Sequence, residues 1–96
     1  MRLRRAARAD SNQTAIVTVL RGLGALWIPV GHPFDGLTGW RRHWYPTEVK
    51  DGSKAPSRRK FTDDQLAFLR DCEAYSLPVL VLTDPETVYA ALKGLE

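Results

Sequence analysis

The chain has 96 residues, a formal net charge of +3 and one cysteine, a length that fits a single domain with a modest core and no second module. No stretch approaches the ~18 consecutive apolar residues of a membrane span, and the opening residues MRLRRAARAD lack the apolar centre of a signal peptide. Cys72 has no partner for an intramolecular disulfide. We therefore expect one domain over residues 1–96, in a protein of the cytoplasm that has no membrane segment.

The charge is distributed unevenly along the chain. Residues 1–40 carry five arginines against two acids, residues 41–60 carry seven Lys/Arg against two acids, and residues 61–96 carry two against seven. Positive charge gathered in one part of a chain is typical of contact with a polyanion such as DNA. Residues 1–9 form a basic tail that either touches phosphates or is simply solvated.

The first half of the chain predicts a helix followed by three strands. Residues 10–21 place apolar side chains at helical spacing and are followed by two glycines, which predicts a helix. Residues 25–30 form a short apolar run bounded by glycine, which predicts a strand. Residues 34–38 and 43–50 then predict an antiparallel hairpin with its turn at residues 39–42.

The second half predicts a helix, a strand and a last helix. After a polar loop over residues 51–60, Thr62 and Gln65 form a capping box that begins a helix running to about Tyr75. The continuous apolar run 77–82 predicts a central strand buried on both faces, and a helical crossover before it predicts parallel pairing with an earlier strand. The last helix begins near Pro85. The fold class is therefore α/β, in the order α-β-β-β-α-β(-α), with a central mixed sheet flanked by helices.

The predicted hairpin brings three charged residues together. If residue 41 pairs with residue 42, Asp35 lies opposite Glu48 with Cβ atoms roughly 5 Å apart, and Lys50 points to the same face because strand side chains alternate. Two carboxylates at that distance repel unless a cation or a shared proton compensates, which predicts a divalent metal site. The alternative is an edge hairpin with a solvated ladder of ion pairs.

These residues resemble a known family. The sequence PFD at 33–35, then EVK at 48–50 and a basic loop leading into the Thr62 helix, resembles the PD-(D/E)XK nucleases, especially the small stand-alone VRR-NUC type related in fold to Holliday-junction resolvases. The similarity covers roughly residues 10–95. It implies a restriction-endonuclease-like fold and hydrolysis of DNA, with Mg²⁺ or Mn²⁺ held by Asp35, Glu48 and the carbonyl of Val49.

The resemblance also implies roles for other residues. Lys50 would orient the attacking water or stabilise developing charge, and Gln65 would reach the active site, close its own helix cap, or do both. Gln13 stands in the context Asn-Gln-x-x-Ile, where such nucleases carry a metal-facing glutamate. An amide oxygen is a weaker ligand for a hard cation than a carboxylate, so Gln13 is either a reduced catalytic residue or an ordinary surface glutamine.

The expected partner is DNA, either branched or duplex, held through its backbone. The candidate phosphate contacts are Lys54, Ser57, Arg58, Arg59, Lys60, Arg41 and Arg42.

Related nucleases commonly form homodimers, which suits a branched junction. The aromatic cluster at the hairpin tip (Trp40, His43, Trp44, Tyr45) either stacks on bases, covers the core or forms a dimer contact. The small size is compatible with a phage or prophage origin and hence with host-cell cytoplasm.

Two other functions remain open at this point. The chain is alternatively a catalytically weak DNA-binding module on the nuclease scaffold, or a protein-interaction domain whose aromatic hairpin docks a partner. The sequence offers no Ser-His-Asp arrangement, zinc-ligand cluster or phosphate-cradling glycine loop, so those enzyme classes are set aside.

Overall fold

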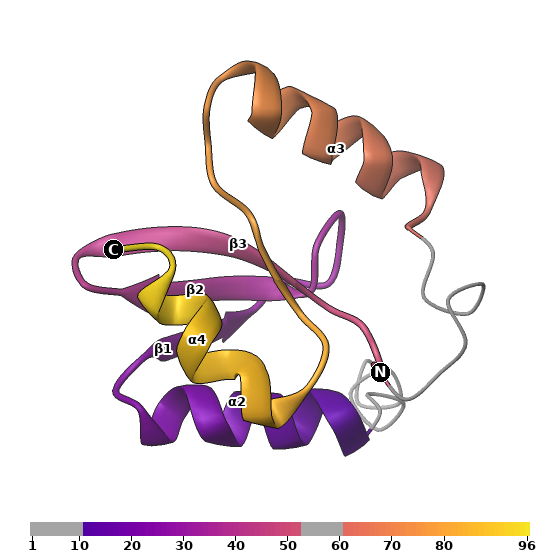
Figure 1. Ribbon diagram of the computed structural model, residues 1–96. Helices are drawn as coiled ribbons and strands as arrows, with labels where there is room; N and C mark the ends of the chain where they lie inside the picture. Colours follow the sequence, from indigo (N-terminus) through magenta and orange to yellow (C-terminus); the bar gives the residue numbers. More distant parts are fainter. Residues whose placement is uncertain (1–10, 53–60) are drawn as a thin grey trace.

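The structure is a computed structural model that describes residues 11–52 and 61–96 (Figure 1). A four-stranded mixed sheet carries helices on both sides, which confirms the α/β class and the predicted order of elements. The elements are α2 (Ser11–Gly22), β1 (Leu26–Pro29), β2 (Gly36–Trp40), β3 (His43–Val49), α3 (Asp63–Ala74), β4 (Leu80–Leu82), the 3-10 turn η2 (Pro85–Thr87) and α4 (Val88–Lys93). No helix of the described ranges is long and apolar enough to span a membrane.

The strands lie in the order β1-β2-β3-β4. The first three form an antiparallel meander, and β4 pairs with β3 in parallel, as the helical crossover predicts. The expectation of a central last strand buried on both faces is wrong. In the described part of the chain β4 is an edge strand of three residues, and Val81 is 41% exposed because it points to the sheet face that α2 and α4 do not cover.

The core lies on one face of the sheet. Strand alternation turns Trp27, Trp40, Tyr45, Leu80 and Leu82 to the same side, where α2 and α4 cover them with a second set of buried residues, Ile16, Leu20, Val88 and Leu92. Trp40 and Tyr45 therefore belong to the core, whereas their hairpin neighbours His43 and Trp44 are exposed. Tyr45 is thus excluded as a residue of an exposed dimer contact.

The hairpin has the predicted register, although its first strand covers Gly36–Trp40 and not residues 34–38, and its turn is shorter than the predicted 39–42. Gly36 lies opposite Thr47 and Trp40 opposite His43, with a two-residue turn at Arg41 and Arg42 between the strands. Gly36 is required where β2 begins, because a Cβ there would come within 2.6 Å of the Trp27 ring. The register places Asp35, directly before β2, level with the carboxyl end of β3.

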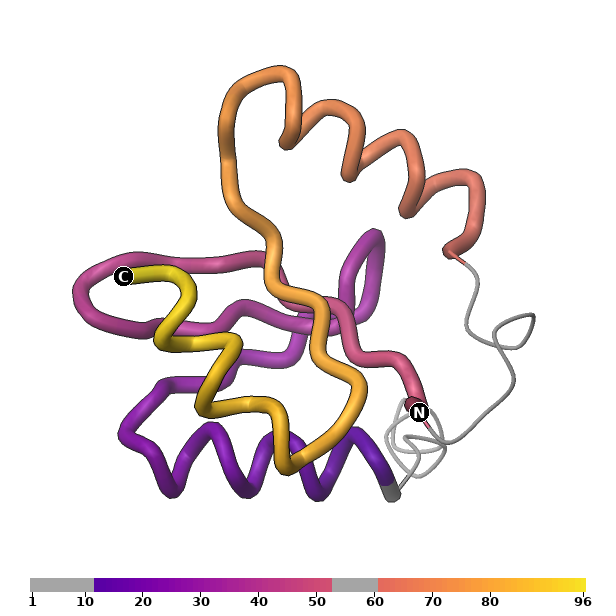
Figure 2. The backbone as a smooth tube through the Cα atoms, viewed as in Figure 1, coloured from indigo at the N-terminus to yellow at the C-terminus, as the bar shows by residue number. Residues whose placement is uncertain are grey.

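The helix α3 lies on the other side of the sheet from α2 and α4 (Figure 2). It begins with the predicted capping box, in which the Thr62 side chain accepts a hydrogen bond from the backbone N–H of Gln65. The Phe68 ring of α3 contacts the Phe34 ring, with centroids 5.0 Å apart. Cys72 is buried, and burial raises the pKa of its thiol. The amino-terminal end of α3 is thereby held over the end of the hairpin.

Candidate active site

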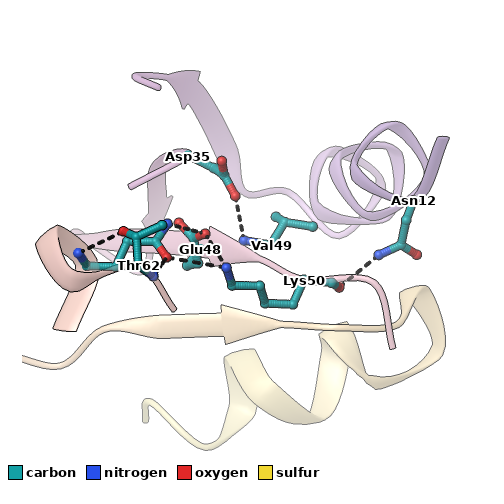
Figure 3. Close-up of polar contacts among 7 residues, drawn as sticks. Asn12, Asp35, Glu48, Val49, Lys50 and Thr62 are labelled. Carbon is teal, nitrogen blue, oxygen red and sulfur yellow. Dashed lines mark hydrogen bonds and ion pairs between the residues drawn. The ribbon is translucent and has the colours of Figure 1, made fainter. Parts of the chain in front are cut away.

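Asp35 and Glu48 lie at the same end of the hairpin, where the Asp35 carboxylate points to the backbone of Val49 (Figure 3). Asp35 Oδ2 accepts a hydrogen bond of 2.7 Å from the backbone N–H of Val49, the residue next to Glu48. The negative charge of Asp35 contributes to a raised pKa of Glu48. The charge of Asp35 thus acts on Glu48, although the ladder of β2 and β3 ends at Gly36 and Thr47 and does not include the predicted pair of residues 35 and 48.

Glu48 is the buried acid of this pair, at 6% exposure. Its Oε2 accepts a hydrogen bond of 2.6 Å from Gln65 Nε2 and lies 3.2 Å from Lys50 Nζ. Its Oε1 is buried and has no hydrogen-bond partner among the described residues. Burial is the main cause that raises the Glu48 pKa and Asp35 is the second, while Lys50 and Gln65 act in the opposite direction. A solvated ladder of surface ion pairs is thereby excluded as a description of this site.

Lys50 lies on the same face of β3 as Glu48, as strand alternation predicts. Besides its ion pair with Glu48, Nζ donates a hydrogen bond of 3.3 Å to Gln65 Oε1. The ammonium also lies 4.9 Å from the centre of the Phe61 ring, a cation–π distance. The amine is therefore held beside Glu48 by a carboxylate, an amide and an aromatic ring.

Gln65 closes its own helix cap and also contacts Glu48. Its Oε1 accepts a hydrogen bond of 3.0 Å from the backbone N–H of Thr62, which completes the capping box, and its Nε2 binds Glu48. The same side chain therefore starts α3 and ties that helix to the carboxylate of β3.

Two contributions to the site are absent from the sequence-based prediction. Asn12 Nδ2 donates to the backbone carbonyls of Lys50 (2.9 Å) and Thr83 (3.2 Å), which joins α2 to the ends of β3 and β4. Its only sequence signal is its place directly before Gln13. The second is an apolar wall beside Glu48, formed by Phe34, Phe61 and Phe68, which lines a cavity of about 10 Å³ with room for about one water.

The other predicted residues fall into three groups. Gln13 is half-buried and lines a separate hollow of about 250 Å³ with Trp27 and Pro29. Arg41 and Arg42 are exposed at the tip of the hairpin, at the far end of β3 from Glu48. The basic tail 1–9 and the predicted loop contacts lie outside the described residues; the contacts are Lys54, Ser57, Arg58, Arg59 and Lys60.

The donor set suits a hard cation but is small. No group of three or more His, Cys, Asp or Glu side chains that could hold a metal occurs in residues 11–52 and 61–96, and Asp35 and Glu48 form a pair of acids. A strand residue directs its N–H and C=O to the same neighbour, so the Val49 carbonyl lies on the side of Asp35. Two carboxylates and a carbonyl are oxygen donors of the kind that Mg²⁺ and Mn²⁺ prefer, and the unpartnered Glu48 Oε1 fits this use.

Comparisons of the chain with models of protein families, with curated proteins and with solved structures found no match.

Proposed function

We propose that the protein is a metal-dependent DNA endonuclease of the PD-(D/E)XK type that selects its substrate by structure and cleaves branched or junction DNA. The observation that carries the proposal is the buried Glu48, whose Oε1 lacks a partner in the described chain while Oε2 is held by Lys50 and Gln65. Leaving a buried charged oxygen unsatisfied costs about 1–3 kcal/mol or more. A bound cation would remove that cost.

Asp35, Glu48 and the carbonyl of Val49 would hold the Mg²⁺ or Mn²⁺ ion. When bound, the cation supplies Lewis-acid chemistry: it favours deprotonation of water and neutralises negative charge on the phosphate. Gln65 fixes the carboxylate of Glu48 through Oε2, so Oε1 would be left to bind the ion. Asp35 is fixed in turn by the N–H of Val49.

Lys50 would stabilise the negative charge that develops during hydrolysis of a phosphodiester. Its ammonium is confined between Glu48 Oε2 and Gln65 Oε1, so it keeps a fixed direction and needs little reorganisation during the reaction. From this position it donates a hydrogen bond to the attacking water or to a phosphate oxygen. The Phe61 ring beside it keeps water from one side of the ammonium and strengthens this interaction.

Binding to DNA rests on the backbone phosphates. Arg41 and Arg42 are exposed for such contacts, and the basic residues at 54–60 add positive charge directly after Lys50 in sequence. Contacts to phosphates carry no base sequence, so cleavage should depend on the shape of the DNA. A homodimer would present two such sites to a branched substrate.

The test is cleavage of labelled four-way junction, flap and linear duplex DNA with Mg²⁺ or Mn²⁺. We expect metal-dependent cutting that Glu48→Gln and Lys50→Ala each reduce by about 100-fold or more, while both variants still shift DNA in a gel. Glu73→Gln on the exposed side of α3 is the control for loss of a carboxylate and should cut normally. Cutting that survives Glu48→Gln would refute the proposal.

One observation favours a second candidate, a DNA-binding module with weak or no catalysis. Gln13 replaces the acid that the nuclease context would supply, and Asp35 and Glu48 are then the two acids left in the described part of the site. This candidate predicts salt-sensitive DNA binding that ignores Mg²⁺ and is equal in wild type and Glu48→Gln. Absence of cutting together with such binding would establish it in place of the nuclease.

A further inference from the structure

The side chain of Trp44 forms a flat apolar platform near the tip of the hairpin. Trp44 lies directly opposite Gly39 in the ladder, and a Cβ at Gly39 would be 3.2 Å from Trp44 Cζ3 and 3.4 Å from Leu26 Cβ. The indole therefore lies across the glycine, in the space that a side chain there would fill. Trp44 is nonetheless 55% exposed, so the ring packs on the sheet and still offers a large surface to solvent.

The two residues of the turn place positive charge beside this ring. Arg41 and Arg42 have φ of 51° and 76°, the left-handed conformation that favours asparagine and glycine in such turns. Arg41 lies 4.9 Å from the Trp40 ring and pairs with Glu96, which also pairs with Lys93. Arg42 is exposed and forms no ion pair within residues 11–52 and 61–96. Of the two arginines in the turn, Arg42 is therefore the one whose guanidinium group can bind an anion.

Ring and charge border the same recess. A shallow hollow of about 300 Å³ is lined by Gly24, Leu26, Gly39 and residues 40–44, so Trp44 and both arginines of the turn border one space. Its volume is at the lower limit of sites that hold a small organic molecule. An apolar floor with cationic borders fits a flat ring that is joined to a phosphate.

We propose that this recess binds single-stranded DNA, with one base stacked on Trp44 and a neighbouring phosphate on Arg42. Exposed aromatic rings beside cationic side chains are the stacking platforms of proteins that bind single strands, and a base inside a duplex has no free face for such stacking. The charge selects DNA over an apolar peptide, because the arginines of the recess attract phosphates. Stacking accepts any base, so the site should be indifferent to sequence.

The recess lies on the same face of β3 as the candidate active site. Trp44 and Glu48 are four residues apart, so strand alternation turns both side chains to one face at a separation of about 13 Å. A strand anchored on Trp44 reaches Glu48 within a few nucleotides. This consequence rests on the proposed nuclease function, and it specifies the substrate as DNA with a single-stranded arm next to the cut. Binding of the single strand itself requires no catalysis.

The experiment measures fluorescence anisotropy of labelled oligo-dT with the full chain in EDTA. Trp44→Ala should weaken binding about 5- to 150-fold, the range that corresponds to loss of one base stack. Trp44→Phe keeps a ring and should retain most of the affinity, which separates lost stacking from lost folding. Arg42→Ala should weaken binding and lower the slope of log K against log[salt] by about 0.7. Tyr75→Ala, at a 77% exposed aromatic at the carboxyl end of α3, outside the residues that line the recess, should change nothing.

Equal affinity of wild type and Trp44→Ala for oligo-dT would overturn the proposal, as would an equal loss in Tyr75→Ala. A Trp44→Ala variant that loses self-association in sedimentation but binds oligo-dT normally would assign the platform to a second copy of the chain instead. The catalytic proposal fails separately. Trp44-dependent binding without any cutting refutes the nuclease and leaves this site, whereas Glu48-dependent cutting with Trp44-independent binding does the reverse.

Discussion

Glu48 combines burial, a neighbouring acid and a cationic partner in one side chain. Burial first and the charge of Asp35 second raise its pKa above the usual 4.5, against the opposing effects of Lys50 and Gln65. In the metal-free protein the folded state therefore binds this proton more tightly than the unfolded chain does. The resulting stabilisation is fully present below pH 4.5 and is lost as the pH rises through the raised pKa of the folded state.

The corresponding prediction concerns the free energy of unfolding in EDTA, measured with urea at a series of pH values. Relative to Glu48→Gln, which remains neutral, wild type should become steadily less stable as the pH rises from below 4.5 towards neutrality. Glu73→Gln controls for removal of an exposed carboxylate. A constant difference between wild type and Glu48→Gln over this range would contradict a raised pKa at this position.

In the hairpin, the turn residue Arg42 affects both the stability of the fold and the proposed binding of DNA. The left-handed backbone of Arg42 costs roughly 1–2 kcal/mol in a residue with a Cβ, whereas glycine adopts it without a steric penalty. Arg42→Gly should therefore raise Tm by a few degrees in thermal unfolding followed by circular dichroism. Arg42→Ala keeps the strain and should not. Both variants should bind oligo-dT more weakly. Such a result would indicate that Arg42 is kept at a strained backbone position because it binds DNA.

The same elements show what the sequence can predict. The hairpin register follows from a two-residue turn, and the capping box from Thr62 and Gln65, because both are set by neighbours in sequence. The exposure of Val81 could not be predicted, since it depends on where the helices lie. Asn12 reaches carbonyls 38 and 71 residues away, and no local pattern specifies such contacts.

Trp44 and Tyr45 are both aromatic, so their residue type does not distinguish them. Strand alternation in the fold places Tyr45 in the core and leaves Trp44 exposed on the opposite face.

For the whole molecule, the candidate site is the place where its layers meet. Asn12 brings α2 to the end of β3, Gln65 brings α3 to Glu48, and the contact of Phe34 with Phe68 adds a second attachment of α3. A cation bound to Glu48 would thus lie where α2, the sheet and α3 come together. Ligand binding to the folded state alone stabilises the entire domain by mass action.

The last prediction is a metal-dependent gain in thermal stability at neutral pH. Mn²⁺ at about 100 times its Kd should stabilise the fold by about 2.7 kcal/mol, which raises the Tm of a domain of this length by roughly 11–22 °C. Glu48→Gln should remove the gain because it replaces an oxygen donor and the charge that attracts the ion. Amide hydrogen exchange adds a local measurement: since Gln65 links α3 to Glu48, metal should slow exchange in α3 of wild type only. Equal shifts in both proteins would place the ion elsewhere, and no shift in wild type would remove the basis for metal-dependent chemistry at this site.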